Sequence, residues 1–106
     1  MTPIPPKLRQ EMADDPFYKQ CCIMGKTNEK INWHHNFQFA GRQLNEKWCI
    51  LPLAESIHDS ITDYKDICDW IMLNRATEAT LKKYSKAVDL IRKREYLNKK
   101  FKLLNL

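Results

Sequence analysis

The apolar run Trp48–Leu53 is the feature that most constrains the fold of this chain. Its sequence, WCILPL, is short and apolar throughout, which predicts a strand. Pro52 should end this strand or occupy an unpaired edge position, because proline has no amide N–H to donate. An earlier segment, Ile31–Phe39, alternates in part between apolar and polar side chains. It predicts a partner strand that turns or bulges around His34 and His35.

Helices are predicted on both sides of these strands. A proline-rich, extended start leads into a short helix over Lys7–Ala13, and two more helices are expected over Glu55–Ile61 and Asp63–Asn74. From about Glu78 the chain should be helical nearly to its end, with Thr77 as the N-terminal cap. Two strands among several helices indicate the α+β class. The packing stripe expected on the helix over Asp63–Asn74 consists of Ile67, Trp70, Ile71 and Asn74.

A chain of 106 residues is long enough for one domain with a modest core. We expect a single domain over residues 1–106, with the strands inside 17–62 and a helical extension over 63–106. With 43% apolar and 29% charged residues, the composition is that of a soluble globular protein rather than a disordered one. No membrane span and no signal peptide are predicted, so we expect a cytoplasmic protein. Its four cysteines are then expected to be reduced thiols.

Positive charge is concentrated at the C-terminal end of the chain. Residues 82–106 contain nine basic and two acidic side chains, a formal charge of +7, whereas residues 1–81 total −2. A basic helix attached to a nearly neutral body suits a polyanionic partner. A solvated helix face with no partner would have the same composition, so the charge pattern by itself leaves both interpretations open.

The order of the three histidines along the chain points to a shared site. His34 and His35 are adjacent in the expected first strand, and His58 follows the expected second strand, on a helix. Adjacent strand residues point to opposite faces, but at a strand end or a bulge they diverge by less. One imidazole could then bind a metal ion while its neighbour faces a substrate. A helix packed across both strands could bring His58 to the same ion.

This arrangement resembles the core of the HNH endonucleases, which have the ββα-metal fold. The resemblance is carried by Trp33-His34-His35, the strand Ile50–Leu53 and His58, and it covers residues 21–62, about 40% of the chain. The string WHHNFQFAGRQLNEKWCILPLAESIH is also similar to phage-encoded members, including recombination-associated nucleases of temperate phages. The C-terminal LNRAT…KYSKAVDLI…REYLNKK resembles the extension of some small phage nucleases. The resemblance implies a ββα-metal core at 17–62, after a short N-terminal segment and before a helical extension.

The resemblance also implies a role for each histidine. His34 and His58 would bind one divalent metal ion, and His35 would be the general base that activates water for hydrolysis of a DNA phosphodiester. An imidazole, with an unperturbed pKa of about 6.5, suits a general base near neutral pH. Two imidazoles suit Zn²⁺, Ni²⁺ or Mn²⁺, whereas Mg²⁺ prefers oxygen ligands, and the sequence leaves the identity open. Phage recombination or packaging proteins are candidate partners.

The chain departs from the family pattern at the structural zinc site that many members have. Their two Cys-x-x-Cys pairs would fall on Cys21 and Met24, and on Ala54 and Ile57. Only one of these four positions is a cysteine, and a structural zinc ion needs about four ligands. No structural zinc is therefore expected, and apolar packing should replace it.

A second departure concerns the asparagine that helps to fix the general base in the family. Counting back from His58, this position is Cys49, and Asn45 lies four residues earlier as a candidate substitute that could orient His35. No third protein ligand for the metal is evident. The candidates within helical reach of His58 are Asp59, Thr62 and Asp63, of which Thr62, at i+4, shares its face. The candidates for DNA phosphate contacts are Arg42, Lys82, Lys83, Lys86, Arg92, Lys93 and Arg94.

Two other functions remain open at this point. The first is a catalytically inactive nucleic-acid-binding module that retains the HNH fold, which the cysteine at position 49 favours. The second is a structural zinc domain for protein contacts, which requires Cys21, Cys22 and Cys49 as ligands.

Overall fold

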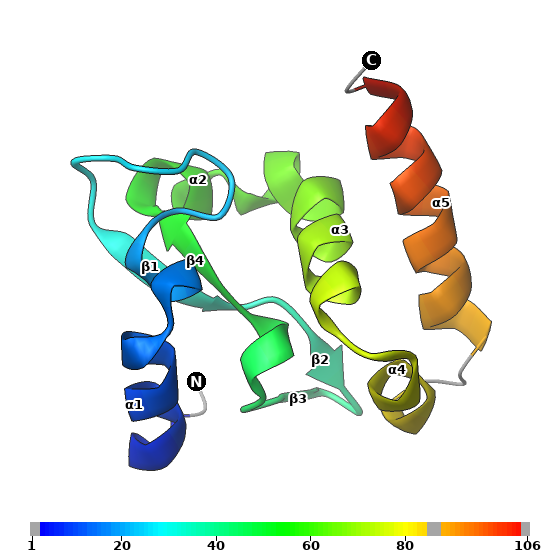
Figure 1. Ribbon diagram of the computed structural model, residues 1–106, viewed down its shortest axis with the longest axis horizontal. Helices are drawn as coiled ribbons and strands as arrows, with labels where there is room; N and C mark the ends of the chain where they lie inside the picture. The colour runs from blue at the N-terminus through cyan, green and yellow to red at the C-terminus, as the bar shows by residue number, and fades with distance from the viewer. Residues whose placement is uncertain (1–2, 85–87, 105–106) are drawn as a thin grey trace.

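The computed structural model describes residues 3–84 and 88–104, and it has the mixed α+β architecture expected from the sequence (Figure 1). The strands are β1 (Ile31–His35), β2 (Gln38–Phe39), β3 (Arg42–Gln43) and β4 (Ile50–Ala54). The α-helices are α1 (Pro6–Asp14), α2 (Glu55–Asp59), α3 (Lys65–Arg75), α4 (Glu78–Tyr84) and α5 (Val88–Leu104). Short 3-10 helices cover Pro16–Lys19, Lys47–Cys49 and Ile61–Tyr64. No helix within the described residues is long and apolar enough to cross a bilayer.

The antiparallel pair β1–β4 carries the two adjacent histidines at the end of β1. His34 lies opposite Leu51, and His35 lies opposite Ile50. All five residues of β4 are buried, whereas those of β1 are half-buried, so β4 is the buried strand of this two-stranded pair. The carbonyl of Pro52 accepts a hydrogen bond from a loop amide rather than from β1. Because the backbone of Pro52 points away from β1, the pair loses no hydrogen bond through the absent N–H. This is the unpaired edge position that was one of the two predicted for Pro52.

Both strands are shorter than the sequence pattern predicts. β1 ends at His35, and the next amide, that of Asn36, donates to the Cys49 carbonyl at an N···O distance of 2.8 Å. The residues that follow form the separate hairpin β2–β3, closed by Ala40 and Gly41. Both turn residues have a positive φ, 52° and 77°, which is the geometry of a tight type I′ hairpin. The predicted strand over residues 31–39 is thus two strands with a change of direction.

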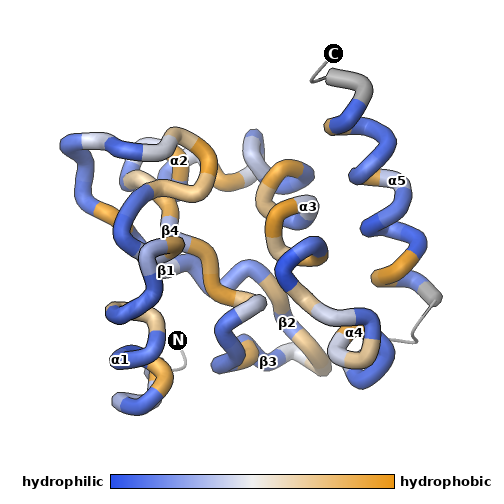
Figure 2. Tube along the Cα trace, in the orientation of Figure 1, coloured by the Kyte–Doolittle hydropathy of each residue, from blue (hydrophilic) through white to orange (hydrophobic). Residues whose placement is uncertain are grey.

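The helices pack in sequence outward from the strands. α2 contacts both β1 and β4, α3 contacts β4, and α5 contacts the far side of α3, so α3 lies between the strands and α5 (Figure 1). The main core cluster joins β4, α2 and α3, and its largest fully buried side chains include Leu51, Leu53 and Leu73. A smaller cluster of Met12, Tyr18 and Ile50 attaches α1 to the other side of β4. Figure 2 shows the apolar course of β4 and the mainly hydrophilic surface of α5.

The described part of the C-terminal segment is helical from Glu78, as predicted, but it forms two helices and not a single one. α4 ends at Tyr84 and α5 begins at Val88, and the two helices run in different directions (Figure 1). The Tyr84 ring lies against Phe39 of the hairpin, at a centroid distance of 5.6 Å, whereas α5 packs along α3. One straight helix could not make both contacts. The predicted cap is confirmed, because Thr77 Oγ1 accepts from the backbone N–H three residues later at 3.1 Å.

The stripe predicted for α3 is not the most buried face of that helix. Its fully buried residues are Cys68, Asp69, Met72 and Leu73, of which all but Asp69 belong to the main core cluster with β4. The predicted stripe turns toward α5 instead. Trp70 stacks on Phe101 at a centroid distance of 4.9 Å, and its Nε1–H donates to Asn98 at 2.8 Å. A helix packed on two sides buries two stripes, and the apolar pattern alone favoured the shallower one.

Candidate functional site

His34 on β1 and His58 on α2 meet edge to face. Their ring centroids are 5.2 Å apart and their planes are inclined by 68°. The short helix α2 follows β4 directly and turns back over the strand pair. The Glu29 carboxylate holds its first turn, since it accepts from the backbone N–H of Ser56 at 2.8 Å and from its hydroxyl at 3.0 Å. A carboxylate at a helix N-terminus satisfies free N–H groups and interacts favourably with the helix dipole.

The spacing of these two rings fits a shared metal ion. Two imidazoles that bind one tetrahedral ion through bonds of about 2.1 Å have ring centres about 5 Å apart. The observed centroid distance of 5.2 Å matches this spacing. No group of three His, Cys, Asp or Glu side chains suited to a metal ion occurs within residues 3–84 and 88–104. If an ion were bound between the two rings, His34 and His58 would be its protein ligands, and water or a phosphate oxygen would have to complete its coordination.

The environment of His34 keeps its imidazole in the neutral form. Burial lowers the pKa of His34 to about 4, and the neighbouring His58 and the positive charge of Lys65 act in the same direction. The Asn36 side chain opposes them, because its oxygen favours the protonated ring. Metal ions bind the neutral imidazole and compete with protons for it. His34 is therefore ready to bind a metal ion at neutral pH without losing a proton.

Acidification should destabilise the protein through His34. Its pKa in the folded state, about 4, lies below the value of 6.5 for a free imidazole, so the unfolded chain takes up the proton first. The contribution of His34 to the free energy of unfolding is therefore fully present above about pH 6.5. It decreases as the pH falls toward 4, by about 1 to 2 kcal/mol for a partly solvated ring. Thermal melts at several pH values, compared with those of His34→Gln, measure this. Parallel profiles for the two proteins would contradict the expectation.

His35 has a different partner. Its Nε2 lies 2.9 Å from Asn45 Oδ1, and Asn45 Nδ2 donates to the Pro3 carbonyl at 2.9 Å. A carbonyl oxygen only accepts, so the second bond fixes the orientation of the Asn45 amide. Oδ1 then accepts in turn from His35, which assigns the proton of the neutral ring to Nε2 and leaves Nδ1 free to accept a proton. Asn45 thus makes the contact to His35 for which it was a candidate.

Cys49 lies at the position where the resemblance to HNH nucleases expects an asparagine that contacts His35, but it is a core residue. Its side chain is fully buried in the main core cluster. Burial raises the pKa of the Cys49 thiol well above its usual value, so it remains a neutral, apolar side chain. The asparagine that contacts His35 therefore lies four residues before Cys49, in the segment that precedes the 3-10 helix Lys47–Cys49.

The positions that correspond to the zinc pairs are mostly packed into the core. Cys21, Ala54 and Ile57 are buried there, as the sequence predicts, but Met24 is 49% exposed. All four cysteines of the chain are free thiols. The alternative of a structural zinc domain requires three cysteines around one ion, and no such group is found in the described part of the chain.

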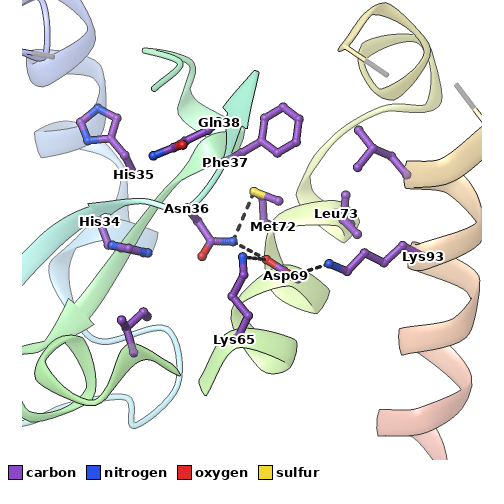
Figure 3. Close-up of a pocket in the computed structure, with 12 residues that line it drawn as sticks. His34, His35, Asn36, Phe37, Gln38, Lys65, Asp69, Met72, Leu73 and Lys93 are labelled. Carbon is purple, nitrogen blue, oxygen red and sulfur yellow. Dashed lines mark hydrogen bonds and ion pairs between the residues drawn. The ribbon is translucent and has the colours of Figure 1, made fainter. Parts of the chain in front are cut away.

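A buried carboxylate beside the histidines was missed by the sequence interpretation. Asp69 on α3 is 2% exposed, and it accepts hydrogen bonds from Asn36, Lys65 and Lys93. Asn36 Oδ1 is buried and lies on the side of His34, the ring on which it acts (Figure 3). Such an acceptor can receive the N–H of a metal-binding histidine and orient its ring. One signal was available in the sequence, namely a charged residue set between Cys68 and the apolar residues that follow it.

Asn36 and Asp69 line one open hollow together with His34 and His35, whereas His58 is not part of its lining. Its volume is about 420 Å³, and its walls come from the end of β1, from α3 and from α5 (Figure 3). Its polar lining consists of His34, His35, Asn36, Gln38, Lys65, Asp69 and Lys93. The hollow therefore brings the adjacent histidines together with two lysines.

The other candidate residues lie outside this hollow. α2 ends at Asp59, which is exposed, so Thr62 is not on the same helix face as His58 and lines a separate hollow with Asp66 and Lys100. The i+4 relation assumed for Thr62 is wrong for this reason.

The candidate phosphate contacts are scattered over the surface. Arg94 lies 3.6 Å from the Glu78 carboxylate and is only 21% exposed, whereas Lys93 binds Asp69. Lys86 lies outside the described residues. Exposed side chains are those of Arg42 on β3, Lys82 and Lys83 on α4, and Arg92 on α5. Among the basic residues predicted to contact DNA, Lys93 is the one that lines the histidine hollow.

Comparisons with known protein families, with curated proteins and with solved structures gave no match. The function has to follow from the chemistry of the described residues.

Proposed function

We propose that the chain is a metal-dependent endonuclease of the HNH class that hydrolyses phosphodiester bonds of DNA. The observation that carries this proposal is the meeting of His34 and His58, 5.2 Å apart, beside a third histidine that is oriented by an asparagine. The order of β1, β4 and α2, with histidines at the end of β1 and on α2, supports a ββα-metal core.

His34 and His58 are the residues that would hold the ion. When bound, a divalent ion supplies Lewis-acid stabilisation of the charge that develops on the leaving 3′ oxygen. His34 contributes a neutral imidazole because burial disfavours its protonated form. The two rings come from different elements, β1 and α2, whose contact is fixed by the register of the strand pair and by the short connection from β4. The site is thus built on rigid elements rather than on a loop.

His35 would act as the general base. Its Nε2 is engaged by Asn45, so Nδ1 would take the proton from the attacking water. His34 and His35 are consecutive residues of β1, and their side chains diverge (Figure 3). A phosphate at the end of this strand could have the base on one side and the metal ligands on the other. An in-line displacement requires this arrangement, because the nucleophile and the leaving group lie on opposite sides of phosphorus.

The role of Asn45 gives a prediction of its own. Asn45→Ala should lower the cleavage rate about 10- to 100-fold, because the His35 ring loses the bond that fixes its tautomer and its direction. Asn45→Asp is the matched control, since a carboxylate oxygen still accepts from Nε2–H, and it should lose less activity. The measurement is the initial rate of plasmid nicking. An alanine variant as fast as the unchanged protein would exclude this role.

The experiment that tests the proposed function is a nicking assay on supercoiled plasmid. The protein is incubated with Mg²⁺, Mn²⁺, Ni²⁺ or Zn²⁺ in turn, and with a chelator as the control. We expect conversion of supercoiled to open-circular DNA with at least one ion and no conversion with the chelator. Nicked products should be ligatable, since the family leaves 5′-phosphate and 3′-hydroxyl ends. The absence of cleavage with all four ions would contradict the proposal.

One observation favours a second candidate, a DNA-binding module that does not cleave. Among the described residues, no third His, Cys, Asp or Glu joins His34 and His58 in a group that could hold a metal ion. Such a module would bind duplex DNA with a strong dependence on salt and would nick no plasmid with any ion. The nicking assay therefore separates the two candidates.

A further inference from the structure

We propose that Lys65 and Lys93, held by the buried carboxylate of Asp69, form a binding site for a DNA phosphate next to the one that is cleaved. This inference rests on the proposed function, because it assigns a position to the substrate of the same hollow. Lys93 is then the residue through which the basic helix α5 contributes to the histidine hollow.

The anchor of this site is a carboxylate with no free oxygen. Asp69 is 2% exposed. Its Oδ1 accepts from Asn36 Nδ2 and from Lys65 Nζ, both at 3.0 Å, and its Oδ2 accepts from Lys93 Nζ at 2.7 Å. A buried carboxylate needs a partner of opposite charge, and one lysine would suffice to neutralise it. The second lysine leaves the group with a net charge of +1, which a purely structural role does not require.

Both lysines keep donors that can reach a ligand. The side chain of Lys65 is 58% exposed and that of Lys93 is 44% exposed, although the carboxylate that they bind is buried. Each ammonium group has three N–H donors and uses one of them on Asp69. Because Asp69 already fixes their positions, the lysines would lose little conformational entropy when an anion binds between them.

The location of the lysines selects a phosphate of the nucleic acid substrate. Lys65 and Lys93 line the same hollow as His34 and His35, from α3 and α5 respectively (Figure 3). The charge of Lys65 is close enough to act on the His34 ring. A strand with its scissile phosphate at the histidines, running from β1 toward α5, would place a neighbouring phosphate along this wall. Lysine contacts of this kind position the backbone and carry no sequence information.

The chain offers a matched control on the same helix. Lys99 is an exposed residue of α5 that lies outside the histidine hollow. Its replacement by glutamine removes one positive charge from the protein, as Lys93→Gln does. The two variants therefore have the same net charge and differ in whether the lost lysine lines the hollow.

The test measures binding of a short, fluorescently labelled DNA duplex by anisotropy, with a chelator present so that no metal ion contributes. Lys65→Gln and Lys93→Gln should each weaken binding about three- to tenfold and reduce the slope of log K against log salt by about 1. Lys99→Gln should change both quantities less. Binding by Lys65→Gln and Lys93→Gln that equals that of Lys99→Gln would overturn the proposal. So would a lower melting temperature in these two variants with unchanged binding, because the lysines would then serve only to neutralise Asp69.

A second measurement covers variants that fail to fold. In the unchanged protein, lysine acetylation is followed by mass spectrometry with and without the same duplex. Lys65 and Lys93 should be protected by the duplex more strongly than Lys99, and equal protection of all three would overturn the proposal.

The outcomes also separate this site from the nuclease function. If the plasmid is nicked but the lysine variants bind DNA as Lys99→Gln does, the function stands and the phosphate site is wrong. If no ion supports nicking but the lysine variants lose binding, the phosphate site stands and the nuclease proposal is wrong.

Discussion

Replacing His35 by alanine should lower the rate of metal-dependent plasmid nicking by about 10²- to 10⁴-fold, the usual contribution of a general base. The physical reason is that His35 is the histidine whose ring is oriented by Asn45, with Nδ1 left to accept a proton. Water activation would then depend on bulk solvent. The measurement is the single-turnover rate at saturating metal concentration, which isolates the chemical step from product release.

Three controls make the His35→Ala result specific. The affinity for a metal ion, measured by calorimetry, should be unchanged, because His34 and His58 are the proposed ligands. The melting temperature should change little, since the His35 ring is only half-buried. Added imidazole should restore part of the activity if the missing group is a base. A variant that nicks plasmid at the original rate would refute the assignment of His35.

His58→Ala should weaken binding of Ni²⁺ or Zn²⁺ by about 100-fold or more, since even indirect partners of metal ligands contribute about 10- to 100-fold. His58 is one of two imidazoles that meet, and no third His, Cys, Asp or Glu compensates for it among the described residues. The measurement is calorimetric titration of the protein without DNA, so that cleavage plays no part. Activity should fall together with metal occupancy.

The fold should survive this substitution. α2 is held by the buried side chain of Ile57 and by the Glu29 carboxylate at its first turn, and neither contact involves the imidazole. His35→Ala serves as the matched control, because it removes an imidazole from the same region and should leave metal affinity intact. Equal metal affinity in the two variants would show that His58 is not a ligand.

Much of the fold could be predicted because it follows local rules. The apolar run around Leu51 lies in the buried strand β4, Thr77 caps the helix that follows it, and Lys7–Ala13 lies within helix α1. Periodicity, capping and turn chemistry act over a few residues, so a sequence displays them directly. The meeting of His34 and His58 was expected from the order of the elements, but it depends on the pairing of β1 with β4 and on the contact of α2 with both strands, which are not local.

The division of the C-terminal segment into two helices and the most buried stripe of α3 were not predicted, because two packing requirements compete in each case. α4 and α5 are separate helices because one contacts the β2–β3 hairpin and the other packs on α3. The most buried stripe of α3 contains a charged residue, Asp69, and apolar periodicity could not select it. Each choice depends on partners that are distant in the sequence.

The sequence by itself determined which chemistry the chain has available: three imidazoles at a strand end and on the next helix, and a basic C-terminal segment. The tertiary structure alone decided which asparagine contacts His35 and which lysine of the basic segment lines the histidine hollow. The reason is physical. Hydrogen bonds and ion pairs act over about 3 Å. Lys93 lies 24 residues after Asp69 in the sequence, so their ion pair depends on how α3 and α5 pack and not on any pattern along the chain.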